Sequence, residues 1–161
     1  MEYRNDQIRR QDRLLDHQEA LKLLKESEYG FLSMQLPDGG GYGIPINYAW
    51  DGTSSLYIHC APEGKKLDCI RQHPDVSFCI VGRTEIQPAK FTTAYESVHL
   101  CCRAHTDLPD EERHKALELI LEKYSPQDKE IGLKYAEKSF HRTAAIRLDI
   151  LTWSGKCKKK L

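Results

Sequence analysis

The sequence predicts a mainly β protein with flanking α-helices, built around a chiefly antiparallel sheet. Apolar residues alternate with other types in several segments, most regularly over residues 42–50, as is typical of half-buried strands. Short turns rich in Gly and Asp, at 37–41 and 51–54, join successive strands in the first half, and turns this short require antiparallel neighbours. Helical spacing of apolar residues is confined to a few segments, the clearest of which is 108–124.

In the first half, a helix is expected to begin after Asp16, an N-cap type of residue that Glu19 follows at the capping-box spacing. Strands are expected at 29–36, 42–50 and 55–60. The strand over 42–50 carries its apolar side chains on one face: Tyr42, Ile44, Ile46, Tyr48 and Trp50. Pro45 lies within this strand and has no N–H to donate. The strand therefore has a free side there, as an edge strand, at a bulge, or against a bound planar ligand.

In the second half, a short helix is expected after residues 61–64, and Pro74 ends it. Strands follow at 76–82 and 93–105, then helices at 108–124 and 125–140. The closing strand, 143–155, is expected to place two sets of side chains on opposite faces: Ala144, Ile146, Leu148 and Ile150 on one, and Arg147, Asp149, Leu151 and Trp153 on the other. The total is about six strands and three or four helices.

The length of 161 residues suits one domain that buries its own core. We expect a single domain over residues 1–161, with an N-terminal extension at 1–15 and a solvated basic tail at 156–161. The formal net charge of zero gives no argument for nucleic acid or a membrane as a partner. No apolar run approaches the roughly 18 residues of a membrane span. The charged segment 1–15 does not resemble a signal peptide, so a cytoplasmic location is expected.

The six cysteines include no CxxC pair, and in a reducing compartment they are expected to be free thiols that pack as small hydrophobes. His59 and Cys60 are neighbours on a strand, so their side chains point to opposite faces and cannot easily bind one ion. His99 and Cys101 share a face, but a zinc site needs three or four converging ligands. We therefore expect no metal site. Cys60 is followed by two lysines that would favour a thiolate, although a packed thiol at a strand end is the commoner arrangement.

The segment 59–66, HCAPEGKK, has the features of a phosphate site. It leaves a strand, passes through a Pro-Glu-Gly turn and opens a helix near Lys65. The N–H groups of a helix N-terminus and lysine ammonium groups both suit a phosphate oxyanion. The alternative is a solvated pair of lysines on the first turn of a surface helix.

The order of these segments resembles the flavin-binding split-barrel proteins, in the branch related to pyridoxamine 5′-phosphate oxidase that includes 5-nitroimidazole resistance proteins. The resemblance covers nearly the whole chain, and its most specific part is 58–78, IHCAPEGKKLDCIRQHPDVSF. This segment matches the family pattern His-x-Ala-x-x-Gly-x-Lys followed by a helix and a strand. His73 stands where the family commonly has Asn.

The resemblance implies a six-stranded antiparallel split β-barrel that forms a homodimer with FMN at the subunit interface. It implies that the flavin ring lies along the backbone of Gly43, Ile44, Pro45 and Ile46. It places His59, Lys65 and Lys66 near the ribityl phosphate. It takes Tyr95, Glu96, Ser97 and Val98 from the other subunit and packs Trp153 by the flavin. In the nitroimidazole-resistance branch the histidine lies close to the reactive centre, so His59 is also the candidate catalytic residue.

One departure from the family limits the expected activity. True pyridoxamine phosphate oxidases carry an Arg-x-His segment near the C-terminus, whereas Arg147 is followed here by Leu148 and Asp149. Oxidation of vitamin B6 is therefore not expected. The resemblance implies an FMN-dependent oxidoreductase that takes electrons from a reduced nicotinamide and passes them to a small oxidant such as a nitroaromatic or a quinone. The alternative is a flavin- or haem-binding module of the same fold without turnover.

Overall fold

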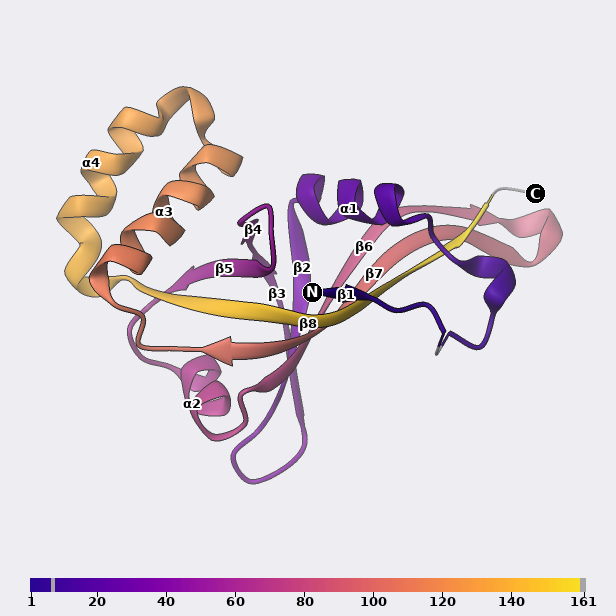
Figure 1. Cartoon of the computed structure of the whole chain (residues 1–161), viewed down its shortest axis with the longest axis horizontal. Helices are drawn as coiled ribbons and strands as arrows, with labels where there is room; N and C mark the ends of the chain where they lie inside the picture. Colours follow the sequence, from indigo (N-terminus) through magenta and orange to yellow (C-terminus); the bar gives the residue numbers. More distant parts are fainter. Residues whose placement is uncertain (7, 160–161) are drawn as a thin grey trace.

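The computed structural model describes residues 1–6 and 8–159 of the chain (Figure 1). Its strands are β1 (Glu2–Tyr3), β2 (Tyr29–Gln35), β3 (Gly41–Asn47), β4 (Ala49–Trp50), β5 (Ser55–Cys60), β6 (Asp75–Gln87), β7 (Thr92–His105) and β8 (Ala144–Lys158). Its α-helices are α1 (His17–Glu26), α2 (Lys65–Gln72), α3 (Asp110–Tyr124) and α4 (Lys129–Ser139). The six longer strands correspond to those expected from sequence, β4 is the end of the strand expected at 42–50, and β1 is additional. No helix in the described part of the chain is long and apolar enough to cross a membrane.

The strands form one sheet in the order β3-β2-β6-β7-β8-β5-β4, and β1 pairs with β8 in parallel. Every other pairing is antiparallel, as expected. The two end strands of this path, β3 and β4, are separated in sequence by Tyr48 alone. A single residue joins the two edges of the sheet, so the sheet must curve until these edges meet. This connection is what closes the sheet into a barrel.

The expectation of one continuous strand over 42–50 was therefore wrong, and the backbone of Tyr48 shows why. The Tyr48 N–H donates to Tyr124 Oη at 3.0 Å, and Lys123 Nζ donates to the Tyr48 carbonyl at 2.9 Å. Side chains at the end of α3 thus take the place of a neighbouring strand. The Tyr48 side chain continues into the core, where its hydroxyl donates to the Leu24 carbonyl at 2.6 Å.

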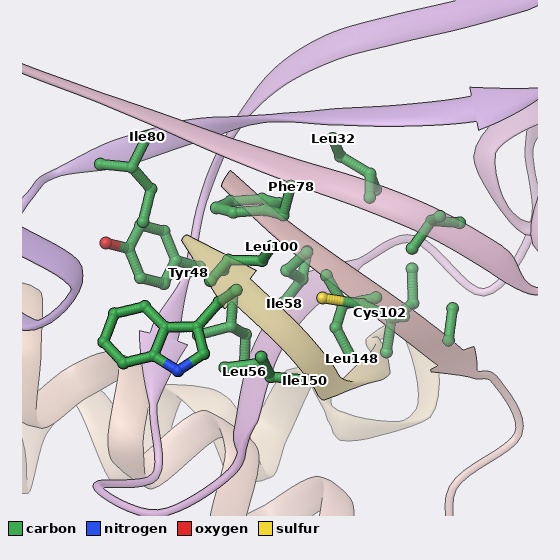
Figure 2. Packing of buried hydrophobic residues seen from close by; sticks show 14 of the residues in the cluster. Leu32, Tyr48, Leu56, Ile58, Phe78, Ile80, Leu100, Cys102, Leu148 and Ile150 are labelled. Carbon is green, nitrogen blue, oxygen red and sulfur yellow. The ribbon is translucent and has the colours of Figure 1, made fainter. Parts of the chain in front are cut away.

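The core fills the concave side of the sheet and is closed by α1 and α2. Figure 2 shows its centre, where Phe78 lies among aliphatic side chains from neighbouring strands and meets the Tyr48 ring at a centroid distance of 5.1 Å. The fully buried side chains of this cluster include Leu32, Leu56, Ile58, Ile80, Leu100, Ile146 and Leu148. Asp16 caps α1 as expected, because its carboxylate accepts the N–H groups of Gln18 and Glu19.

A β-bulge in β8 overturns the expected facing of Trp153. Cys101 is paired with Thr152 and Cys102 with Ile150, so Leu151 has no partner on β7. The extra residue reverses the alternation beyond it. Trp153 consequently points inward with 2% of its surface exposed, while Leu151 is 54% exposed.

The β6–β7 hairpin is longer than expected and projects beyond the barrel as an arm, together with the end of β8 (Figure 1). Residues 156–158, expected to be a solvated tail, belong to β8 and pair with Tyr95, Glu96 and Ser97. The rest of that tail from residue 160 lies outside the described residues. The N-terminal extension is anchored to the barrel because β1 pairs with β8 and Leu15 is buried.

Candidate functional site

The end of β5 leads directly into the N-terminus of α2, as the motif at 59–66 predicted. Gly64 is the N-cap of α2 and has φ +131°, a backbone conformation that residues with a Cβ rarely adopt. No side chain caps this end of the helix. The first N–H groups of α2 therefore remain available to an external acceptor, and an anion is the acceptor that a helix N-terminus favours.

Lys65 and Lys66 are the first two residues of α2. Lys65 Nζ lies 4.7 Å from the centre of the Tyr42 ring on β3. Lys66 lies near His59, whose pKa is lowered by partial burial and, to a lesser extent, by the Lys66 charge. The two lysines thus connect the beginning of β3, the end of β5 and α2 into one region.

Cys60 does not have the environment of a reactive thiolate. Burial raises its pKa, although the charges of Lys66 and Arg71 act in the opposite direction. This supports the expectation of a packed thiol. All six cysteines are free. Within residues 1–6 and 8–159, no group of three or more His, Cys, Asp or Glu side chains is placed to hold a metal ion.

His59 lies on the opposite face of β5 from Cys60, toward the α3–α4 hairpin. There it forms part of the wall of an apolar cleft with a volume of about 450 Å³. The other walls of the α3–α4 cleft come mainly from apolar residues of the two helices: Leu117, Ile120, Leu121, Ile131, Tyr135 and Ala136. Sequence reasoning missed this cleft because its other walls, from Leu117 to Thr143, are 58 to 84 positions from His59 in the chain. The helical periodicity of 108–124 showed an apolar face but not what that face covers.

The backbone of β3 is accessible along one edge, as Pro45 suggested. Among the described residues, β3 pairs only with β2, so its other side carries no strand. Pro45 and Ile46 line a shallow hollow of about 390 Å³ together with the exposed rings of Tyr29 and Phe31. Gly43 and Pro45 lie on the outer face of β3, whereas Ile44 and Ile46 pack against the core.

The remaining predicted site residues lie elsewhere in the chain. Tyr95, Glu96, Ser97 and Val98 are on the arm, where Tyr95 is paired with Thr84 and Lys158. The Val98 side chain is fully buried and its backbone is paired with Ile80 on β6 and Gly155 on β8, so a flavin contact by Val98 stays a prediction that this placement does not favour. Trp153 packs against the rings of Tyr3 and His17, at 4.5 and 5.4 Å. A flavin contact by the Trp153 side chain stays a prediction, which this burial does not favour.

Arg147, the arginine of the altered C-terminal segment, is already occupied by carboxylates. Its Nη1 donates to Glu112 Oε1 and its Nε to Asp149 Oδ1, both at 2.8 Å. Tyr57 donates to the same Glu112 oxygen at 2.9 Å, and Ser55 to Asp149 at 2.9 Å. Arg147 thus ties α3 to the sheet and does not present a free guanidinium to a substrate phosphate.

Replacing Arg147 by methionine is expected to lower the free energy of unfolding by about 1–2 kcal/mol, because two partly buried carboxylates lose their arginine partner and keep only their weaker contacts. Arg103→Met is the matched control, since Arg103 pairs with Asp75 at the surface at 2.8 Å. The control should cost less than about 1 kcal/mol. Urea unfolding of both variants measures the difference, and equal losses would show that the Arg147 network does not stabilise the docking of α3.

Comparison with known proteins agrees with this fold. Residues 16–157 match the family described as pyridoxamine 5′-phosphate oxidase. The chain therefore belongs to this family, and its fold is the split barrel with flanking helices that the sequence predicted. No curated protein matches the chain in sequence.

Several solved structures share the fold. A candidate 5-nitroimidazole antibiotic resistance protein from Bacteroides thetaiotaomicron aligns with TM-score 0.76 and 18% identity, over 90% of this chain and 86% of that one. A FAD and haem binding protein from Mycobacterium smegmatis aligns with TM-score 0.71 and 17% identity, over 92% and 74%. A FAD-binding protein from Mesorhizobium loti aligns with TM-score 0.63 and 24% identity, over 91% and 98%.

Proposed function

We propose that the protein is an FMN-dependent oxidoreductase that transfers electrons from a reduced nicotinamide to a small oxidant such as a nitroaromatic or a quinone. The observation that carries this proposal is the uncapped N-terminus of α2 with Lys65 and Lys66, placed between His59 and the open edge of β3. A flavin mononucleotide needs a cationic end for its phosphate and exposed backbone groups for its ring. This region offers both.

The residues of the chain have distinct tasks in this proposal. The first N–H groups of α2 and the two ammonium groups hold the phosphate, and the backbone of Gly43–Ile46 orients the ring. When bound, the isoalloxazine supplies the electron transfer itself. His59 has a pKa below its ordinary value of 6.5, so it is neutral at pH 7 and can donate one hydrogen bond while accepting another. It is the candidate group for holding a proton beside the substrate.

We also propose that the flavin lies at a homodimer interface. The outer face of the neighbouring strands β2 and β6 exposes Tyr29, Phe31 and Val81, each between 42% and 53% accessible. Such neighbouring apolar side chains on a sheet face are typical of a protein interface. The arm carries Tyr95, Glu96 and Ser97 beyond the core, whereas Val98 at the base of the arm belongs to it. The position of Tyr95, Glu96 and Ser97 suits a contribution to the site of a partner subunit.

A second candidate function is flavin or haem binding without turnover. It is favoured by the structural likeness to the FAD and haem binding protein, which shows that this fold is found in a protein of that kind. Oxidation of pyridoxamine phosphate is not proposed, because Arg147 is engaged by Glu112 and Asp149.

We expect the purified protein to be yellow, and we expect mass spectrometry of the released chromophore to identify FMN. Anaerobic addition of NADH or NADPH should bleach the flavin absorbance, and a nitroaromatic or quinone should restore it. Tight binding of FMN without bleaching would favour the binding module. A colourless protein that does not quench FMN fluorescence in a titration would rule out both flavin proposals.

A further inference from the structure

The α3–α4 cleft is lined mainly by apolar side chains, and part of this apolar lining is exposed to solvent. Two of its lining side chains, Ile131 and Tyr135, are 70% and 65% exposed on α4. The two helices are in close contact at Gly132 on α4, because a Cβ added there would lie only 2.5 Å from Leu121 Cδ2 on α3. This close contact fixes the walls of the cleft at one end. The cleft is therefore a preformed apolar hollow with no cover from the described residues of its own chain.

The tip of the arm carries exposed apolar side chains that could fill such a cleft. Phe91 is 97% exposed and Ile86 is 75% exposed. Phe91 has φ +49°, in the left-handed region that a bulky aromatic residue rarely occupies. The turn Pro88–Lys90 holds it there, since the Phe91 N–H donates to the Pro88 carbonyl at 3.1 Å. A phenyl ring held in a costly conformation and directed into water indicates a binding role for the tip.

The arm tip cannot reach the cleft of its own chain. In Figure 1 the tip between β6 and β7 lies at one end of the molecule, and the α3–α4 hairpin lies at the other. A two-fold axis that lies beside the middle of the molecule, perpendicular to its long axis, would place the tip of one subunit near the helical hairpin of the other, because it reverses the direction of the long axis.

We propose that, in the homodimer, the tip Ile86–Phe91 of one subunit docks into the α3–α4 cleft of its partner, with the Phe91 ring as the anchor beside His59. This inference rests on the homodimer proposed above. There, residues 95–98 contact the flavin of the partner subunit. Phe91 precedes Tyr95 by four residues, which span about 13 Å of extended chain. In the proposed function His59, on the wall of the cleft, also lies beside the flavin, so the short span from Tyr95 to Phe91 suits a tip that enters this cleft.

Size and charge agree with this occupant. A cleft of about 450 Å³ is within the range that accommodates small apolar groups, and buried aromatic anchors commonly dominate the energetics of interfaces. Lys90 adjoins Phe91, and Asp128 is the carboxylate in the lining of the cleft. The neighbouring Lys129 is held by Glu118 and Glu122 at 3.0 and 2.7 Å. No ion pair of Asp128 is found among the described residues, so it is open to Lys90 of a second copy. The docked tip would cover the cleft and exclude water from one side of His59.

The first test is the dimer affinity of Phe91→Asp, measured by analytical ultracentrifugation. Losing the apolar anchor should raise the dimer dissociation constant by about 10- to 100-fold. Leu133→Asp is the matched control, because Leu133 is 40% exposed on α4 but does not line the cleft, and its dissociation constant should not change. A Phe91→Asp dimer as tight as the control would overturn the proposal.

The second test locates the contact directly and stays informative if the affinity change is small. Chains carrying Phe91→Cys and chains carrying Tyr135→Cys are mixed, allowed to exchange subunits and oxidised mildly. The expected product is a covalent heterodimer in which peptide mapping finds the 91–135 disulfide. Pairing Phe91→Cys with Leu133→Cys should give little of this product. A dimer without the 91–135 link, or a chain that is monomeric, would overturn the inference. Flavin binding is measured separately, so a colourless dimer that forms the link would disprove the proposed function and leave this contact standing.

Discussion

Phe78→Ala is expected to lower the free energy of unfolding by about 3–5 kcal/mol, the cost of removing a buried aromatic ring and leaving a cavity. Phe78 is fully buried and meets Tyr48, the residue that joins the two edges of the sheet, edge-on. Its ring also covers Gly30 on β2, where a Cβ would lie 2.3 Å from Phe78 Cε1. Loss of this ring therefore affects barrel closure as well as the core. Guanidinium unfolding followed by circular dichroism measures the change.

The contact with Gly30 allows a sharper control. Gly30→Ala alone should also destabilise the protein, because its Cβ would overlap the Phe78 ring and lie 2.9 Å from the Cys79 carbonyl. In the double variant the overlap with the ring is gone, so the combined loss should be smaller than the sum of the two single losses. Additive losses would show that the ring of Phe78 does not pack over Gly30 as described.

The local elements of this fold could be predicted because their signals are contiguous in the chain. Alternation predicted β2, the turn at 51–54 predicted β5 as the strand that follows it, and Asp16 predicted the start of α1. The break at Tyr48 could not be predicted, since it depends on Lys123 and Tyr124, about 75 residues away. The apolar residues alternate regularly on both sides of Tyr48, so the pattern alone predicts one continuous strand.

The bulge at Leu151 was hidden for a related reason. A bulge is defined by the partner strand, and the sequence of β8 does not state its register against Cys101 and Cys102. The one-residue shift moved Trp153 from the outer face to the core and changed its expected role. Periodicity thus predicts which segments are strands more securely than it predicts which way a side chain points along a long strand.

Part of the candidate site could likewise be predicted from sequence, and part of it could not. The segment from His59 to Lys66 could be found from sequence because a strand end, a turn and a helix N-terminus follow one another directly. The contact of Lys65 with Tyr42 and the cleft beside His59 could not be found from sequence. The residues that form them are far apart in the chain and meet only in the folded barrel and helical hairpin.

The double variant Lys65→Ala, Lys66→Ala is expected to weaken FMN binding by about 1.5–3 kcal/mol, or roughly 10- to 150-fold, because it removes charge-assisted hydrogen bonds to the phosphate. Fluorescence quenching titrations with FMN measure the loss. Lys134→Ala, Lys138→Ala on α4 is the matched control, since both lysines are exposed and lie outside the proposed site. Its affinity should equal that of the unmodified protein.

Riboflavin separates a phosphate contact from a general loss of structure. It has the same ring as FMN but no phosphate, so the double variant should bind riboflavin as well as the unmodified protein does.

The pKa of His59, followed by NMR, gives a second check without any ligand. Burial is the larger cause that lowers this pKa and the Lys66 charge is the smaller one, so Lys66→Ala should raise it part of the way toward its ordinary value. Equal losses for FMN and riboflavin, with the His59 pKa unchanged, would place the phosphate away from α2 and leave these lysines as solvated side chains of a surface helix.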